Sequence, residues 1–140
     1  MSVYALDSNI VSFYLRGNIA VIDNIKKAIN DGHAIVISPI AYYEVKRGLL
    51  LIGAARKLQE LADFCNLFQV GSFGDYLLEE AIEIYVRERK EKRNTADADI
   101  FMAAFCLHNG YILVTDNTRH FENIEGLHLI NWRVLDNSGV

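Results

Sequence analysis

Short apolar runs alternate with longer stretches of helical periodicity along the whole chain, and this alternation constrains the fold more than any other feature. The strand-like runs lie at residues 3–7, 34–38, 68–71, 111–115 and 127–130, and the helical stretches at about 9–16, 19–31, 39–51, 53–66, 75–92 and 97–109. Such alternation favours a three-layer α/β/α fold, in which helices cover both faces of a mainly parallel five-stranded sheet.

Residues typical of helix boundaries agree with these spans. Pro39 fits the first turn of a helix, where its missing N–H costs nothing. Gly32 and Gly110 are well placed to end helices, and Asp75 is a reasonable N-cap. Within the stretch that begins near Asp75, apolar residues recur at helical spacing at Leu78, Ile82, Tyr85 and Val86.

Length and composition indicate a single domain over residues 1–140. Hydrophobic residues make up 51% of the 140-residue chain, which is enough for a sizeable core. No apolar stretch approaches the roughly 20 residues that cross a bilayer, and no basic segment precedes an apolar one at the N-terminus. We therefore expect a cytoplasmic protein with no membrane partner, in which Cys65 and Cys106 are reduced core residues.

The formal net charge of −4 argues against a protein that coats nucleic acid through general positive charge. It does not exclude a nuclease, because an acidic metal site lowers the net charge while a local basic patch still contacts phosphates. Candidate phosphate contacts are Arg16, Lys46, Arg47, Arg119 and the charged run 87–93. The alternative for that run is a solvated helix end whose cations complement the helix dipole.

Four acidic residues each lie beside a short apolar run: Asp7, Glu44, Asp99 and Asp116. In open α/β sheets, ligands bind outside the carboxyl ends of the strands. Several acids at one such edge raise one another's pKa unless a cation lies among them, and a hard divalent cation is the usual partner. Their positions therefore suggest a metal site and, with it, phosphoryl chemistry.

Each acid also has an ordinary structural explanation. The side chains at 7–9 accept hydrogen bonds at helix starts. Glu44 can be a solvent-facing helix acid, either Asp97 or Asp99 can be an N-cap, and the segment 116–118 can be a simple turn. It is the occurrence of all four acids at equivalent places that favours a functional site.

These acids belong to motifs that occur in order along the chain. The motifs are Asp7-x-Asn9, Glu44-x-x-x-Gly48, Asp99-x-x-Met102-Ala103-Ala104, the stretch VTDNTRHF from Val114 to Phe121, and the tail Glu122-x-x-x-Gly126-Leu127-x-x-x-Asn131-Trp132. The ordered set resembles the PIN-domain ribonucleases and, among them, the VapC-type toxins of bacterial toxin–antitoxin pairs. One departure is that many relatives carry Pro-Ile-Gly ahead of the third acid, where this chain has residues Asn94-Thr95-Ala96.

The resemblance implies a catalytic set and its cofactor. Asp7, Glu44 and Asp99 are implied to be the acids of an Mg²⁺ or Mn²⁺ site, with Asp7 and Asp99 as direct ligands. The fourth position falls on Asp116 or Asn117, and we take Asp116 as the third ligand. Supporting hydrogen bonds are expected from Ser8, Asn9, Thr115 and Asn117, whereas Asp97 matches no motif position and is either an outer-shell acid or a helix cap.

The implied function is that of a metal-dependent endoribonuclease toxin. Such a protein hydrolyses RNA phosphodiester bonds, with tRNA as the expected target, and is neutralised by a cognate VapB-type antitoxin. A homodimer is also implied. The alternatives that remain are a catalytically silent PIN-like module that binds RNA or protein, and a nuclease for single-stranded DNA. A receiver-like signalling domain fits less well, because no Lys lies within residues 111–130.

Overall fold

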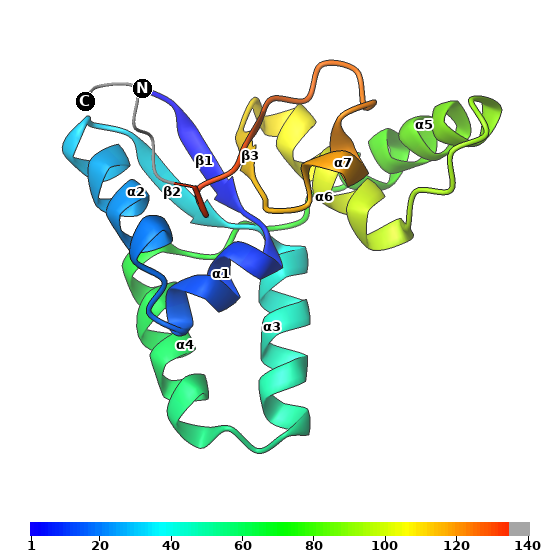
Figure 1. Ribbon diagram of the computed structural model, residues 1–140. Coiled ribbons are helices and arrows are strands. Elements are labelled where there is room, and N and C mark those ends of the chain that lie inside the picture. The colour runs from blue at the N-terminus through cyan, green and yellow to red at the C-terminus, as the bar shows by residue number, and fades with distance from the viewer. Residues whose placement is uncertain (135–140) are drawn as a thin grey trace.

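Four parallel strands form the sheet in the computed structural model, which describes residues 1–134. The strands are β1 (Val3–Leu6), β2 (Ala34–Ile37), β3 (Ile112–Val114) and β4 (Leu129–Ile130). Their order across the sheet is β2-β1-β3-β4, so the first strand lies in the middle between strands that come later in the chain. This arrangement confirms the expected mainly parallel α/β sheet (Figure 1).

The expected strand at residues 68–71 is not formed, so the sheet has one strand fewer than predicted. In its place, Val70 makes an isolated parallel bridge to Ile37 at the outer edge of β2. The backbone of Gln69 has a φ of 64° and a ψ of 148°, a positive-φ conformation that interrupts an extended strand. The apolar run is therefore real, but its backbone cannot pair over several residues.

Seven helices lie within the described residues. They are α1 (Ser8–Leu15), α2 (Ile19–Asn30), α3 (Pro39–Leu51), α4 (Ala55–Phe68), α5 (Tyr76–Lys90), α6 (Asp97–Asn109) and the short α7 (Thr118–Phe121). Pro39 occupies the first turn of α3 and Gly110 ends α6 in a left-handed conformation, as expected. Asp75 does precede α5, but its side chain accepts no capping hydrogen bond.

The helices form two groups on opposite sides of the sheet (Figure 1). Helices α1 to α4 pack against one another on one side, and α5 pairs with α6 on the other. Both cysteines are free, and Cys106 is buried in the core as predicted. None of the helices in residues 1–134 is both long and apolar enough to cross a membrane.

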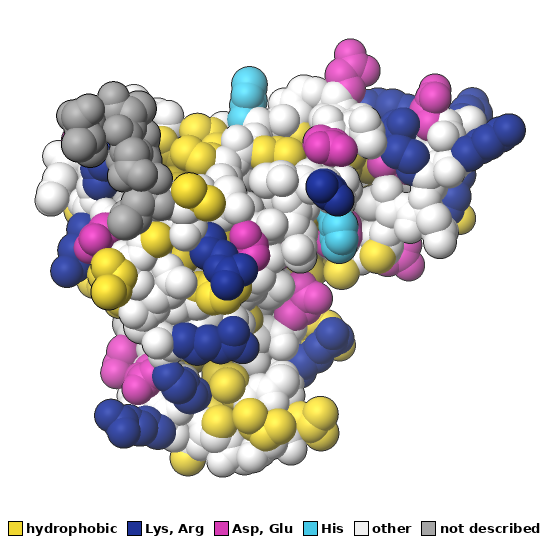
Figure 2. Space-filling view, viewed as in Figure 1, with side chains coloured by type: hydrophobic (Ala, Val, Ile, Leu, Met, Phe, Trp, Pro, Cys, Tyr) yellow, Lys and Arg dark blue, Asp and Glu magenta, His cyan; other side chains and the backbone are white. Residues whose placement is uncertain are grey.

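Two apolar surfaces remain exposed on this fold. Leu50, Leu51 and Ile52 lie at the turn between α3 and α4, where Leu51 is 87% exposed, and Figure 2 shows this turn as an apolar tip. The second surface is the outer face of α5, because the buried stripe of that helix is Leu77, Ala81 and Ile84. The apolar series that was evident in the sequence faces outward there: Leu78, Ile82, Tyr85 and Val86.

The carboxyl ends of the strands meet at one edge of the sheet. Backbone hydrogen bonds run from Asp7 N–H to the carbonyl of Val114 (2.9 Å) and from Thr115 N–H to the carbonyl of Ile130 (3.0 Å). Asp7 and Thr115, each the first residue after its strand, are thus neighbours at this edge, although 108 positions separate them in the sequence. The parallel topology alone brings these two residues to the same place.

Candidate functional site

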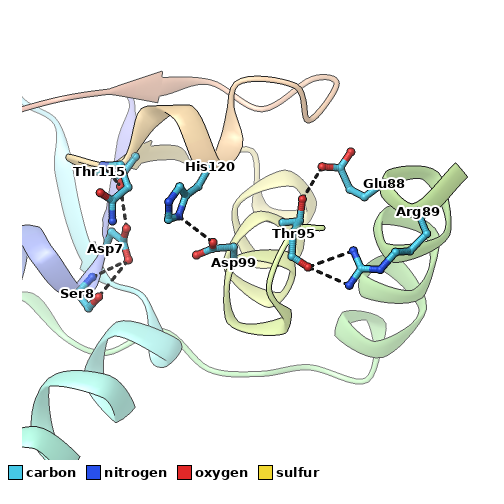
Figure 3. Close-up of polar contacts among 9 residues, drawn as sticks. Asp7, Ser8, Glu88, Arg89, Thr95, Asp99, Thr115 and His120 are labelled. Carbon is cyan, nitrogen blue, oxygen red and sulfur yellow. Dashed lines mark hydrogen bonds and ion pairs between the residues drawn. The ribbon is translucent and has the colours of Figure 1, made fainter. Parts of the chain in front are cut away.

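Asp7 lies at this edge and is held on both carboxylate oxygens. Its Oδ1 accepts a hydrogen bond from the backbone N–H of Ser8 (2.7 Å), so Asp7 also caps α1, and its Oδ2 accepts one from Thr115 Oγ1 (2.7 Å; Figure 3). The capping interpretation and the site interpretation are therefore compatible. Asp7 is only 5% exposed and Thr115 is fully buried, so neither side chain is free to turn away.

The residues that follow β3 extend this network. Thr115 Oγ1 accepts a hydrogen bond from the backbone N–H of Asn117 (3.0 Å) while it donates to Asp7. On the β1 side, Asn9 Oδ1 accepts from the backbone N–H of Asp116 (3.2 Å). Asn9 and Thr115 therefore join the turn after β3 to the start of α1, which is the supporting role expected from their positions.

Asp99 reaches the same region from the first turns of α6. Its Oδ2 lies 3.1 Å from Nδ1 of His120, the third residue of α7 (Figure 3). An ionised carboxylate can only accept, so Nδ1 carries the proton when Asp99 is charged. Asp97, two residues earlier, is exposed and forms none of the described side-chain hydrogen bonds, and Ala96 rather than Asp97 is at the N-cap position of α6.

The electrostatics couple three of the four expected acids. Burial raises the pKa of Asp7, the charge of Asp99 raises it further, and the hydrogen bonds from Thr115 and Ser8 oppose this rise. Burial also raises the pKa of Glu44, on α3, and the charge of Asp7 adds to that rise. Asp7, Glu44 and Asp99 therefore form one group of mutually repelling carboxylates, hereafter the acid cluster.

Asp116 is engaged elsewhere. Its Oδ1 accepts a hydrogen bond from Asn131 Nδ2 (3.0 Å), and its Oδ2 accepts one from Arg133 Nη1 (3.1 Å). The neighbouring Asn117 instead lines a hollow together with Glu44. Of the two candidates for the fourth position, Asn117 thus lines the same hollow as an acid of the cluster, whereas both oxygens of the Asp116 carboxylate accept hydrogen bonds from other side chains.

The chemistry of the acid cluster fits a hydrated divalent cation. Within residues 1–134, no three His, Cys, Asp or Glu side chains converge closely enough to enclose a metal ion. Mg²⁺, however, binds through one or two carboxylates and keeps several of its waters. In the same residues no Lys or Arg forms an ion pair with Asp7, Glu44 or Asp99, so a cation among them would relieve their repulsion.

Sequence reasoning missed a second polar network, at the end of α5. Glu88 is 2% exposed and accepts hydrogen bonds from Arg93 Nε (2.9 Å) and Nη2 (2.6 Å) and from Thr95 Oγ1 (2.8 Å). Arg89 donates to the carbonyl oxygens of Arg93 (3.0 Å) and Thr95 (3.2 Å). These contacts, partly visible in Figure 3, fix the loop 91–96 that leads into α6.

A signal for Glu88 was present in the sequence. It follows Leu77, Ala81 and Ile84 at helical spacing, so it continues the buried stripe of α5. A charged residue in a buried register needs a partner. The charged run 87–93 is therefore only partly a solvated helix end, because Arg89 and Arg93 turn back to hold the chain.

Two hollows flank the acid cluster. The first, hereafter the Glu44-side pocket, has a volume of about 390 Å³ and is lined by Ser8, Asn9, Arg16, Glu44, Arg47 and Asn117. The second, hereafter the Asp99-side pocket, has a volume of about 340 Å³ and is lined by Glu88, Arg93, Asn94, Thr95, Ala96, Asp99, Arg119, His120 and Asn123. Lys and Arg side chains also gather over α1 and α4 (Figure 2). Positive charge therefore borders the acids on both sides.

The chain matches the family model described as PIN domain over residues 4–127. No curated protein sequence matches it.

Among solved structures, the chain is similar to that of VapBC2 from Rickettsia felis bound to a DNA fragment from their promoter, with a TM-score of 0.86, 20% identity, and coverage of 93% of this chain and 98% of that one. It is also similar to DNA-bound VapBC from Salmonella typhimurium (TM-score 0.84, 20% identity, 94% and 99% coverage). A third similar structure is VapBC-1 from nontypeable Haemophilus influenzae (TM-score 0.82, 19% identity, 94% and 99% coverage). At this level of identity the structures share the fold, and because the family model covers most of the sequence, the chain belongs to the PIN-domain family.

Proposed function

We propose that this protein is a VapC-type toxin, a divalent-metal-dependent endoribonuclease that acts on RNA in the cytoplasm. The observation that carries the proposal is the acid cluster: Asp7 after β1, Glu44 on α3 and Asp99 on α6 come from separate elements, and the negative charges of these residues raise one another's pKa. The family to which the chain belongs supports a nuclease. Among RNAs, tRNA is the proposed target.

Asp7 and Asp99 are the proposed ligands for Mg²⁺ or Mn²⁺. When bound, such an ion supplies charge stabilisation at the phosphoryl group and lowers the pKa of a bound water. Thr115 and Ser8 keep the carboxylate of Asp7 in one orientation, and His120 does so for Asp99. Glu44, whose pKa is raised, is suited to orient the attacking water and to accept its proton.

The fourth position requires a choice between two residues. Asp116 can act as the third ligand that the sequence suggested only if its carboxylate leaves Asn131 and Arg133. Asn117 lines the same hollow as Glu44. We therefore propose that Asn117 faces the substrate at this position and that Asp116 stabilises the turn after β3.

Partner proteins are proposed on the basis of two observations. The similar structures are of VapBC proteins, which supports a VapB-type antitoxin for this chain. The apolar tip at Leu50, Leu51 and Ile52 and the outer stripe of α5 are exposed apolar surfaces of the kind that mark protein interfaces. One such surface suits an antitoxin segment, and another suits a second copy of the chain in a homodimer.

A cleavage assay tests the proposal. The purified protein is incubated with tRNA, ribosomal RNA, messenger RNA and single-stranded DNA, with Mg²⁺, Mn²⁺ or EDTA. We expect RNA to be cut only when a divalent ion is present, and Asp7→Asn purified in parallel to be inactive, which excludes a contaminating nuclease. Cleavage of DNA alone would favour the single-stranded DNA nuclease, and no cleavage of any substrate would favour a silent binding module.

A further inference from the structure

The Asp99-side pocket has a preformed wall. Residues 93–96 of the loop 91–96 form that wall, and hydrogen bonds join Arg93 and Thr95 of this loop to Glu88 and Arg89 of α5. Lys92, the residue after the C-cap of α5, has a φ of 60°, a conformation that commonly ends a helix. Burying charged side chains costs desolvation free energy, and here the buried charges fix an exposed loop that borders the acid cluster.

The groups that face this hollow are suited to a nucleotide. Arg119 is exposed, and it forms no ion pair with any residue in 1–134, so its guanidinium is available to a phosphate. Asn94 and Asn123 offer amide donors and acceptors, which match the hydrogen-bonding edge of a base. His120, exposed at 57% of its side chain, presents a ring on which a base can stack.

The position of the pocket relates it to the cleaved bond. Asp99 lines the Asp99-side pocket and Glu44 lines the Glu44-side pocket, while Asp7 couples electrostatically to both acids. An RNA strand whose phosphodiester lies at the acid cluster must continue into the space on either side. Since the acids repel RNA, a cation in each flanking hollow is needed to hold the strand, and Arg119 is such a cation on the Asp99 side.

We propose that the Asp99-side pocket binds the nucleotide that adjoins the cleaved phosphodiester, with Arg119 contacting its phosphate and Asn123 its base. This inference rests on the proposed function, because it requires RNA as the substrate. A protein segment is the less suitable occupant. A basic segment would be repelled by Arg119, and an acidic segment would be repelled by Asp99. In a nucleotide, the anionic phosphate can contact Arg119 while the neutral base lies nearer Asp99.

The test uses variants of exposed residues, which are not expected to alter folding. Arg119→Ala and Asn123→Ala are compared with Lys26→Ala, which removes one positive charge from an exposed site on α2. Affinity is measured for a single-stranded RNA containing the cleavage site, in the Asp7→Asn background and in EDTA, so that neither metal binding nor turnover contributes. Arg119→Ala should weaken binding by about tenfold and reduce the slope of log Kd against log salt by about 0.7, as expected for one lost phosphate contact on a single strand.

Substrate length localises the contact. In the wild-type background, cleavage is compared for RNAs shortened one nucleotide at a time on either side of the cut. The effect of Arg119→Ala and Asn123→Ala on kcat/KM should disappear once the nucleotide on one particular side is removed, and Lys26→Ala should match wild type throughout. If both pocket variants bind and cut every RNA as Lys26→Ala does, or if they weaken only the binding of an antitoxin, the inference is wrong. Failure of the wild-type protein to cut RNA would instead overturn the proposed function.

Discussion

Asp7 and Asp99 belong to the same acid cluster, yet the protein positions them in different ways. Asp7 follows a central strand, is almost completely buried, and accepts hydrogen bonds on both oxygens, from the first residue of α1 (Ser8) and from Thr115, the residue after β3. Asp99 lies on a helix, its side chain is 24% exposed, and a single ring nitrogen of His120 contacts it. The parallel register of the strands fixes the position of Asp7. The position of Asp99 depends on the loop 91–96, which Glu88 holds in place.

The site is therefore rigid around Asp7, whereas around Asp99 it depends on more distant residues. On the Asp7 side, a substitution must alter the acid or its direct hydrogen-bond donor to affect the chemistry. On the Asp99 side, residues at the end of α5 determine where α6 begins, so a change more than ten positions away can move the acid. The predictions below test this contrast.

The largest effect is expected from removing a charge of the acid cluster itself. Asp7→Asn and Asp99→Asn should each reduce cleavage by more than about 100-fold, because loss of a ligand should exceed the 10–100-fold cost typical of residues that only support one. Asp97→Asn, an exposed change of the same kind on α6, is the matched control and should stay close to wild type. Rates are measured at saturating Mg²⁺, and far-UV circular dichroism checks the fold. An inactive Asp97→Asn with an active Asp99→Asn would reverse the assignment.

A smaller loss is expected from Thr115→Val, which preserves shape but removes the hydrogen bond to Asp7 Oδ2. Without that donor, the carboxylate of Asp7 loses an interaction that favours its ionised form, so we expect cleavage to fall by about 10- to 100-fold. Rescue by Thr115→Ser, which restores a hydroxyl, separates the hydrogen bond from packing. If Thr115→Val and Thr115→Ser are equally impaired, packing rather than the hydroxyl is responsible.

On the Asp99 side, the hydrogen bonds of Glu88 should contribute mainly to the free energy of unfolding. Glu88→Gln weakens charge-assisted hydrogen bonds to Arg93 and Thr95, which should lower the free energy of unfolding by about 2 kcal/mol. Glu83→Gln, at an exposed position on the same helix, should leave it unchanged. Urea unfolding near pH 7 measures both. The contrast with Asp7 predicts that Glu88→Gln also slows cleavage, through the placement of α6.

The same network has a defined pH dependence. The hydrogen bond from Arg93 holds the pKa of Glu88 below its ordinary value of 4.5. A carboxyl whose pKa is lowered by folding stabilises the protein fully above its unfolded-state pKa, and this stability is lost as pH falls through the folded-state value. The stability difference between wild type and Glu88→Gln should therefore be constant above about pH 5 and shrink below about pH 4.5. A difference that grows on acidification would contradict the network.

The smallest effect is expected at Asp116. Because Asn131 and Arg133 occupy its carboxylate, Asp116→Asn should change cleavage by less than about threefold, while Asn117→Ala should be more harmful because Asn117 lines the Glu44-side pocket. The two variants are compared at the same Mg²⁺ concentration. A loss at Asp116→Asn as large as that at Asp7→Asn would restore Asp116 as a metal ligand and reject Asn117 at the fourth position.

Much of the fold was predictable because periodicity reports which face of an element is buried. The spans of α3 and α6 were anticipated to the residue, and the parallel sheet followed from the alternation of strands and helices. The prediction of a strand at 68–71 was wrong for a local reason, because hydrophobicity does not reveal the positive φ of Gln69. The four-residue helix α7 is too short to leave a periodic signal.

The site was predictable only where sequence position determines geometry. Asp7 and Thr115 follow strands, so the topology brings them together. The direction of a side chain in a turn depends on partners that are remote in the sequence. The sequence therefore suggested that Asp116 belongs to the acid cluster, whereas its carboxylate accepts hydrogen bonds from Asn131 and Arg133. The contact of His120 with Asp99, 21 positions away, was missed for the same reason. Glu88 was missed although it lies on a helix and its spacing from Ile84 and Ala81 indicated a buried position.

Anomalous diffraction from crystals soaked in Mn²⁺ would show whether the acid cluster binds a divalent cation. We expect a manganese peak between the carboxylates of Asp7 and Asp99 in the wild-type protein, and no such peak in Asp7→Asn. Manganese bound only at other acids, or an empty space between Asp7 and Asp99 at a saturating Mn²⁺ concentration, would contradict the proposed metal site.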